Sequence, residues 1–211
     1  MNAQNTDADK SPLAVGLQIT NLHVLRGMRM VINGLSHQQQ PGDIYCLTGP
    51  NGAGKSTLLR TIANRLPLTD GQIFCSVPVV YVGHNDGLSG SINGQDNLKG
   101  WAKINGFACP TDAIDEALAS FSATGFANIP THRLSRGQRR RLALTRLSLA
   151  PFNSLWLLDE PTASLDQAAT TMLDAASIAH ADGGGMVLAA THLDFAAAAS
   201  PHTITLPGQP E

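Results

Sequence analysis

The segment Gly49–Thr57, GPNGAGKST, combines residue types and a spacing that suit phosphate binding. Its glycines allow backbone N–H groups to approach phosphate oxygens without an intervening Cβ. Lys55 is then expected to reach the β- and γ-phosphates of a nucleotide, Ser56 to ligate Mg²⁺ through its hydroxyl, and Thr57 to add a donor. The predicted phosphate-binding residues are Gly49, Pro50, Asn51, Gly52, Ala53, Gly54, Lys55, Ser56 and Thr57. A glycine-rich turn with an unrelated lysine is the alternative interpretation.

Adjacent carboxylates at Asp159 and Glu160 supply the acidic chemistry that a phosphate loop lacks. They follow the apolar residues 155–158, LWLL, which predict a buried strand. Asp159 is expected to hold the Mg²⁺ shell, and Glu160 to polarise an attacking water. Bound metal and Lys55 would offset the repulsion between these carboxylates and the phosphates. An acidic turn at a strand end is the alternative, but the phosphate loop upstream favours hydrolysis.

A histidine, His192, ends the next apolar segment, MVLAATH. In parallel sheets the C-terminal ends of the strands meet at one edge, where ligands bind. His192 is therefore expected near Asp159 and Glu160, hydrogen-bonded to a γ-phosphate or to its attacking water. Taken alone, such a histidine is more often structural.

The segment LSRGQRRR, residues 134–141, resembles half of a second phosphate site. Ser135 is a good helix N-cap, and the helix that it begins is expected to continue to Pro151. The Ser135 hydroxyl, the Gly137 amide and the helix dipole form a credible anion site. Because the first loop already surrounds one nucleotide, this half-site suits a nucleotide held by another subunit. The arginines at 139–141 point in three directions, which favours a solvated helix flank and dimer contacts over a nucleic-acid patch.

The elements that must position these residues form an α/β pattern. Residues 85–150 are rich in Gly, Asn, Ala and Ser and contain helical patterns, so a mainly helical insert is expected to interrupt a parallel-sheet core. Expected strands lie within 17–25, 28–43, 44–49, 77–84, 154–160, 185–192 and 200–211, and expected helices within 55–66 and 167–182. The predicted organisation is a flexible tail at 1–15 and a single domain at 16–208, with 85–150 as its helical subdomain.

Composition excludes several classes of protein. A chain of 211 residues with a net charge of −2 has no general attraction for nucleic acid. Its cysteines, Cys46, Cys75 and Cys109, lack C-x-x-C pairing, so reduced and buried thiols are expected rather than disulfides or zinc ligands. No segment approaches the roughly 20 apolar residues of a membrane-spanning helix, and the polar N-terminus does not resemble a secretory signal. Any membrane helices are expected to come from another chain.

Taken in order, GPNGAGKST, LSRGQ, LLDEP, ASLD and TH closely resemble the nucleotide-binding subunits of ABC (ATP-binding cassette) transporters over residues 17–206. The resemblance implies a P-loop NTPase core with a mainly parallel sheet, an inserted ABC-type helical subdomain and a small antiparallel β element at the N-terminus. It also implies a head-to-tail dimer that sandwiches ATP. The implied roles are catalysis by Glu160 and His192, contact with the partner's ATP by Ser135, Gly137 and Gln138, and dimer contact by Asp166.

Two residues depart from the pattern of that family. Arg136 stands where the signature usually has a second glycine, so its side chain must point away or add charge to the site. His84 occupies the usual position of a glutamine that touches Mg²⁺ and the coupling face toward the membrane partner. A histidine can serve there as a neutral ligand, although an ordinary loop histidine is the alternative.

Arg26 falls near the position of the family's adenine-stacking aromatic residue and could stack its guanidinium on adenine instead.

A narrower resemblance involves NLHVLRG, NGLS, YVGH, NIPTHRLSRGQRRRLALTRL and the short chain. These are similar to the ATP-binding subunit of the cytochrome c maturation system. The similarity implies ATP and Mg²⁺ as cofactors, an integral membrane partner, a peripheral position on the cytoplasmic face of a bacterial inner membrane, and no directly bound haem. Either haem export or release of a haem-loaded periplasmic chaperone would be energised. The alternatives are another ABC transporter's ATPase, a soluble ABC-type ATPase, or a P-loop kinase, which would not need LSRGQ.

Overall fold

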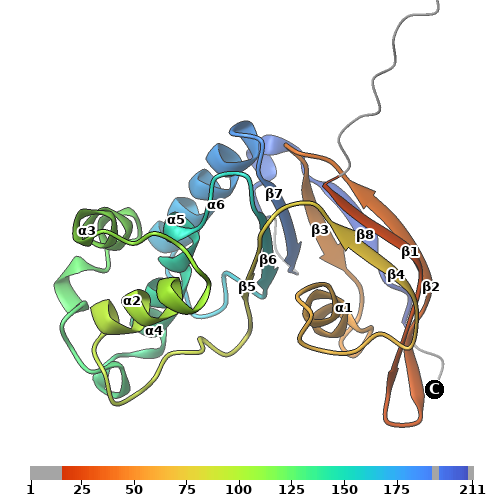
Figure 1. The fold of residues 1–211 in the computed structure, drawn as a ribbon, viewed down its shortest axis with the longest axis horizontal. Helices are drawn as coiled ribbons and strands as arrows, with labels where there is room; N and C mark the ends of the chain where they lie inside the picture. The colour runs from red at the N-terminus through yellow and green to blue at the C-terminus, as the bar shows by residue number, and fades with distance from the viewer. Residues whose placement is uncertain (1–15, 192–194, 209–211) are drawn as a thin grey trace, which may run out of the picture.

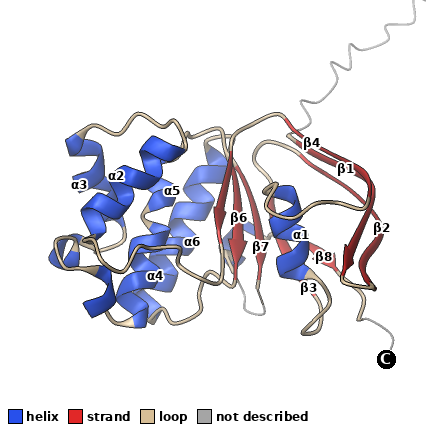
Figure 2. Cartoon of the chain, turned by 60° about the horizontal axis from the view of Figure 1, so that its bottom comes forward, coloured by secondary structure: helices blue, strands red, loops and turns tan. Residues whose placement is uncertain are grey.

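Helix α1 (Lys55–Ile62) lies between two β-sheets in the computed structural model, which describes residues 16–191 and 195–208 (Figures 1 and 2). The antiparallel sheet has the order β2-β1-β4, from Arg29–Gln39, Leu17–Arg26 and Asp70–Cys75. The parallel sheet has the order β5-β6-β7-β3-β8, from Val79–Val82, Leu155–Asp159, Met186–Ala190, Ile44–Thr48 and His202–Thr205. This arrangement confirms the predicted parallel core and the small antiparallel element.

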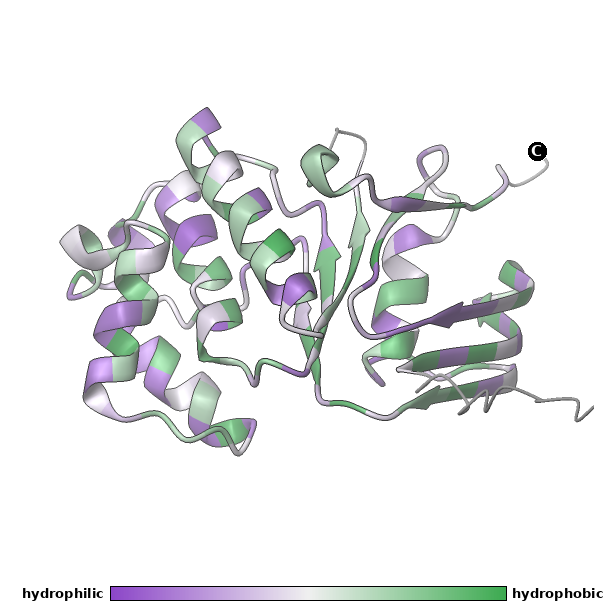
Figure 3. Ribbon diagram, turned by 90° about the horizontal axis from the view of Figure 1, so that it is seen from above, coloured by the Kyte–Doolittle hydropathy of each residue, from purple (hydrophilic) through white to green (hydrophobic). Residues whose placement is uncertain are grey.

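The central strands β6 and β7 are buried along their whole length, and the middle of the molecule is accordingly green in Figure 3. Leu155 and Leu157 face the core that includes α1, whereas Trp156 and Leu158 face the core on the opposite side of the sheet. A continuous apolar segment suits a parallel strand because both faces of the sheet are covered. The sheet therefore carries residue 159 rigidly to its C-terminal edge.

The chain between β5 and β6 forms a helical lobe, on the left in Figure 1. Its α-helices are α2 (Gly94–Ile104), α3 (Thr111–Ser120), α4 (Arg136–Leu144) and α5 (Arg146–Leu149), joined by short 3-10 turns at Thr124–Phe126 and Thr131–Arg133. The lobe has an apolar cluster of its own, which includes Leu98, Ile114 and Leu142. The predicted helical insertion into an α/β core is confirmed.

Helix boundaries differ from the sequence expectations where local polar groups intervene. Helix α1 ends at Ile62 rather than 66, and Asn64 just beyond it adopts a left-handed conformation with φ of 54°. The helix that starts after Ser135 divides at Thr145, whose hydroxyl donates to the Arg141 carbonyl. Helix α6 (Gln167–Asp182) ends at the predicted glycines.

Strand β4 is absent from the sequence expectations, because none of its residues is buried and Phe74 faces solvent. Pairing with β1 and the half-buried Ile73 and Cys75, which pack against the core, place this segment in the sheet. The C-terminal segment does add the expected edge strand, β8, which pairs parallel to β3 after a 3-10 turn at Ala197–Ala199. Across the described ranges, every helix is too short or too polar to span a lipid bilayer.

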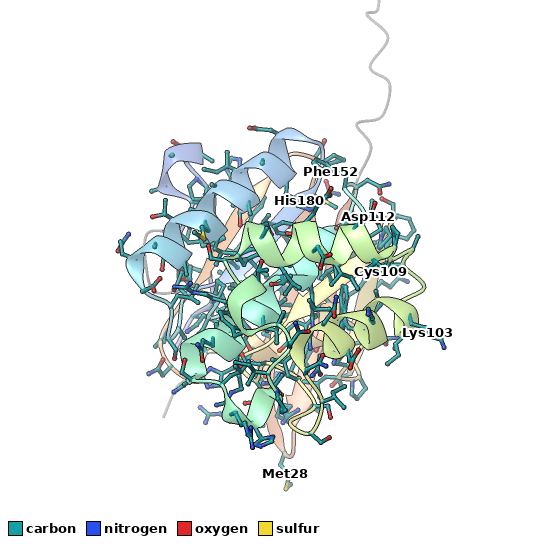
Figure 4. All side chains as sticks on the ribbon, turned by 90° about the vertical axis from the view of Figure 1, so that its left-hand side faces the viewer. Met28, Lys103, Cys109, Asp112, Phe152 and His180 are labelled. Atoms are coloured by element: carbon teal, nitrogen blue, oxygen red, sulfur yellow. The ribbon has the colours of Figure 1, made fainter. Side chains whose placement is uncertain are left out.

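The expected burial of the thiols is right only for Cys46. Burial is also the main reason that the pKa of Cys46 is raised. Cys75 and Cys109 are half-buried, and Figure 4 places Cys109 in the helical lobe between Lys103 and Asp112. The same view shows the fully exposed Met28, in the turn between β1 and β2, projecting at the bottom of the molecule.

Candidate active site

The phosphate loop, residues 49–57, joins β3 to α1 at the C-terminal edge of the parallel sheet. Gly54 caps α1 with φ of 102°, and a Cβ added there would lie 2.7 Å from the Val31 side chain. Both the left-handed backbone and the close strand β2 therefore require glycine at this position. A Cβ added at Gly52 would meet open space, so the loop faces outward there. The N-terminus of α1, behind the exposed Asn51 and Gly52, is the expected anion site.

Lys55 is only 8% exposed and folds back on the loop. Its ammonium group donates to the carbonyl oxygens of Gly49 at 2.7 Å and Pro50 at 3.1 Å. These hydrogen bonds compensate the buried ammonium group for the loss of water. They also keep it beside the phosphate loop.

Ser56 and Asp159 meet across the gap between α1 and β6. The Ser56 hydroxyl donates to Asp159 Oδ1 at 2.8 Å, and the Tyr81 hydroxyl donates to Asp159 Oδ2 at 3.3 Å. Arg60 donates to the Tyr81 oxygen and lies 4.0 Å from the Asp159 carboxylate. Burial raises the pKa of the Tyr81 phenol, which favours the neutral form that can donate. Asp159, 1% exposed, is thus oriented toward the loop serine.

Glu160 follows Asp159 and leaves the strand in an unusual conformation. Its φ is 47°, a value that few residues other than glycine adopt. The side chain is 43% exposed, and one carboxylate oxygen lies 3.2 Å from Nδ1 of His84. The two predicted site residues are therefore in contact, with the carboxylate still open to water.

A cavity of about 340 Å³ lies in front of these groups. It is lined by Arg26, Val31, Asn51, Gly52, Gly54, Lys55, Ser56, Thr57 and Glu160. The loop and the carboxylate predicted to activate water thus share one cavity, which we call the phosphate cavity. Arg26 also borders it, and its stacking on adenine stays a prediction.

The signature segment, residues 134–138, lies outside the phosphate cavity and starts α4 in the helical lobe (Figure 1). Ser135 caps α4 by accepting from Gln138 N–H at 3.2 Å, and the Gln138 side chain accepts from Ser135 N–H at 2.9 Å. Ser135 is exposed, as the predicted role in another subunit's site requires. A Cβ added at Gly137 would lie 2.9 Å from the Ser164 carbonyl oxygen, so glycine permits this close approach.

Asp166 stands at the start of α6 on the surface. Its carboxylate accepts from Ala169 N–H at 2.8 Å and pairs with Arg141. The Ala169 hydrogen bond is the main cause of a lowered Asp166 pKa, and Arg141 adds to it. His192, the other predicted catalytic residue, lies outside the described residues.

Arg140 is the main departure from the sequence expectations, because it is 3% exposed rather than part of a solvated flank. Its guanidinium donates to main-chain oxygens around the site, those of Gly83, Asp159, Glu160 and Pro161, at 2.6 to 3.2 Å. Asp86 lies 3.6 Å away and offsets the charge, although burial still lowers the Arg140 pKa. Neither Arg140 nor Tyr81 carries a sequence signal that separates it from its neighbours.

The fold and the site together define a P-loop nucleotide-binding ATPase of the ABC class. The sequence pattern of the family described as ABC transporter matches residues 32–163. The chain is 41% identical to a cytochrome c biogenesis ATP-binding export protein of Paracoccus denitrificans, over 85% of this chain and 83% of that protein. Its identity to the corresponding protein of Ruegeria pomeroyi is 42%, over 85% and 86% of the two chains. The chain therefore belongs to the ABC transporter family and, within it, to the cytochrome c biogenesis ATP-binding export proteins.

Solved structures share the fold at low sequence identity. A dimeric bacterial ABC transporter cassette aligns with a TM-score of 0.80 and 20% identity, over 90% of this chain and 94% of that one. A dimeric cassette in a post-hydrolysis state, bound to ADP and Pi, aligns with a TM-score of 0.79, 20% identity and the same coverage. The family confirms the predicted resemblance, the fold class, nucleotide binding and the assignment as an ATP hydrolase.

Proposed function

We propose that this chain is the ATP-hydrolysing subunit of an ABC complex that energises cytochrome c maturation through an integral membrane partner. The observation that carries the proposal is the phosphate cavity, in which the phosphate loop and the Glu160 carboxylate face the same space. The names of the relatives supply the pathway, since they are cytochrome c biogenesis ATP-binding export proteins.

ATP binding would begin at the loop. Main-chain N–H groups and the N-terminus of α1 receive the phosphates, and Lys55 exchanges the Gly49 and Pro50 carbonyls for the β- and γ-phosphate oxygens. Arg26 borders the same cavity and would stack its planar guanidinium on adenine.

The residues present suit Mg²⁺. Ser56 and Asp159 place a hydroxyl and a carboxylate oxygen 2.8 Å apart, and Mg²⁺ prefers such oxygen ligands. No cluster of three or more acidic, histidine or cysteine side chains that could hold a metal occurs in residues 16–191 and 195–208. Phosphate oxygens and water would supply further ligands. Bound Mg²⁺ would neutralise charge that develops on the phosphates. His84 contacts Glu160 in this structure, and its role as a metal ligand stays a prediction.

Hydrolysis would be started by Glu160. Its carboxylate accepts the proton of the water that attacks the γ-phosphate, while His84 holds one carboxylate oxygen in place. His192 is proposed to contact the γ-phosphate or that water, as its place after the strand segment suggests. Tyr81 donates to the Asp159 carboxylate and so orients it.

We also propose that two copies close head to tail on ATP. The exposed Ser135, with Gly137 and Gln138, would contact the γ-phosphate bound in the partner's phosphate cavity, and Asp166 would lie at the dimer interface. This arrangement would explain why the signature segment forms a capped helix start without lining the cavity of its own chain. Residues 85–150, the helical subdomain of the domain 16–208, would carry the signature segment toward the partner.

The membrane partner would be a separate integral subunit of the cytochrome c maturation system, and the chain would lie peripherally on the cytoplasmic face of a bacterial inner membrane. Closure and reopening of the dimer would drive haem export or release a haem-loaded periplasmic chaperone. Haem is not proposed to bind to this chain, and neither is nucleic acid.

Affinity purification of the tagged Glu160→Gln chain from native membranes with ATP, followed by mass spectrometry, tests the function. Recovery of a multi-spanning cytochrome c maturation subunit is expected. The same purification with the Lys55→Ala chain is the control for nucleotide dependence. Recovery of a different transporter's membrane subunit would contradict the maturation role but retain the mechanism, and recovery of no membrane protein would favour a soluble ABC-type ATPase.

A further inference from the structure

Arg140 is placed on α4, five residues after the N-cap Ser135, yet its side chain reaches the catalytic turn, residues 159–161. One guanidinium nitrogen, Nη2, donates to the carbonyl oxygens of Asp159 at 2.9 Å and Glu160 at 2.8 Å. These two carbonyls belong to the peptide planes on either side of the Glu160 α-carbon. Main-chain hydrogen bonds from Glu160 N–H to the Ala190 carbonyl at 2.9 Å and from Ala163 N–H to the Glu160 carbonyl at 3.1 Å hold the same planes, and Arg140 adds a side-chain restraint on the φ and ψ of Glu160.

This restraint acts on a conformation that the chain would not adopt readily. Left-handed φ at a residue other than glycine or asparagine is costly, by about 1–3 kcal/mol, and persists only when its surroundings impose it. Glu160 has φ of 47°, and its backbone direction decides where the carboxylate points. Arg140 is the side chain that supplies hydrogen bonds to both sides of this residue.

The same guanidinium also holds the loop that bears His84. Nη1 donates to the Gly83 carbonyl at 2.6 Å, one residue before His84, and lies 3.6 Å from the Asp86 carboxylate. His84 and Glu160, which contact each other at 3.2 Å, are therefore both anchored through their backbones to one buried cation.

We propose that Arg140 is a positioning residue for ATP hydrolysis: from the signature helix it sets the conformation of Glu160 and the place of His84 beside it. The planar fork of arginine matches several carbonyls at once, which the single ammonium group of lysine cannot do. The inference rests on the proposed function, because Glu160 must be the base.

The test compares Arg140→Lys with Arg139→Lys on the full-length chain. Arg139 is next in sequence and also faces Asp86, at 4.0 Å, but the structure gives it no bond to the catalytic turn. Single-turnover hydrolysis is measured with chain in excess of ATP and at a concentration that binds all of it. The amount of chain is corrected for the fraction that binds ATP, so that partial unfolding cannot imitate the effect. Arg140→Lys is expected to slow hydrolysis by about 10- to 100-fold with ATP affinity unchanged, and Arg139→Lys to match wild type.

A double variant separates positioning from a general structural effect. If Arg140 acts through Glu160, Arg140→Lys added to Glu160→Gln lowers the residual rate no further. Equal losses in both backgrounds, or a wild-type rate for Arg140→Lys, would overturn the inference. Should Arg140→Lys fail to fold, Arg140→Gln is measured in the same way, and failure of both to fold would assign Arg140 to stability instead.

Different results would contradict the role of Glu160 as the base and the role of Arg140 as a positioning residue. A Glu160→Gln chain that hydrolyses ATP at the wild-type rate would contradict the proposed function itself. An inactive Glu160→Gln chain beside a fully active Arg140→Lys chain would contradict only the role of Arg140.

Discussion

Replacing the Glu160 carboxylate with an amide should stop hydrolysis and leave nucleotide binding intact. Glu160 lines the phosphate cavity and its side chain is 43% exposed, so Glu160→Gln should remove the base without disturbing the phosphate loop. The turnover rate is expected to fall by about 100-fold or more, with ATP affinity retained. Phosphate release and equilibrium binding of a fluorescent ATP analogue measure the two effects.

Glu116→Gln is the matched control for that variant, because Glu116 is exposed on α3. Equal rates for the Glu160 variant and wild type would show that Glu160 is not the base.

Lys55 gives the complementary result, loss of binding. Its ammonium group already lies beside the phosphate loop, and Lys55→Ala removes the charge that would meet the phosphates. ATP affinity is expected to fall by roughly tenfold or more, as for a lost hydrogen bond to a charged group. Isothermal titration calorimetry measures the affinity, with Lys103→Ala on the exposed part of α2 as the control. Unchanged affinity would remove Lys55 from the phosphate site.

Among the elements, the start of α4 combines two functions in one residue. Ser135 caps the helix and is proposed to face the partner's ATP. Ser135→Arg is expected to slow hydrolysis by on the order of 100-fold while ATP binding to the monomer stays normal, because Ser135 does not line its own cavity. Steady-state hydrolysis and monomer binding at low protein concentration are the measurements.

Loss of the helix cap alone must be excluded as the cause. Asn93→Ala removes the corresponding cap of α2 and should cost a similar ~1 kcal/mol of stability. If the Asn93 variant loses activity as strongly as the Ser135 variant, the proposed contact with the partner's nucleotide is wrong.

Strand β6 controls the stability of the sheet that carries Asp159 and Glu160. Leu157 is fully buried in the core between α1 and the parallel sheet. Leu157→Ala is expected to lower the free energy of unfolding by about 3 kcal/mol, since it removes apolar contacts and leaves a cavity. Urea denaturation followed by circular dichroism measures this loss. Leu68→Ala, at a 38% exposed leucine, should change stability much less, and equal losses would contradict the packing argument.

For the whole molecule, the proposed ATP sandwich predicts a nucleotide-dependent dimer. Glu160→Gln binds ATP without consuming it, so the closed state should accumulate and the molar mass in light scattering should double with ATP. Ser135→Arg on the same background should prevent doubling, because one side of each sandwich is lost. Lys55→Ala on that background is the control for nucleotide binding. A mass that stays monomeric at saturating ATP would contradict the head-to-tail arrangement.

The local site and the general architecture were accessible from the sequence. Residues 49–57 form their motif within nine consecutive positions, and Asp159 and Glu160 are adjacent, so chain connectivity itself places their groups. Buried parallel strands such as β6 and β7 need apolar residues on both faces, so they could also be predicted from the sequence. Strand β4 was missed because its side chains are at most half-buried, and its place in the sheet is seen only from its hydrogen bonds to β1.

The sequence by itself determined the phosphate loop, the carboxylate pair, the capped signature helix and the family to which they belong. Only the tertiary structure decided which distant residues serve them. It placed Tyr81 on Asp159, His84 on Glu160, and Arg140 beneath the catalytic turn. The reason is physical: three consecutive arginines on a helix look alike along the chain. Packing of α4 against the sheet edge then buries one of them, and that one must find carbonyl partners to remain charged.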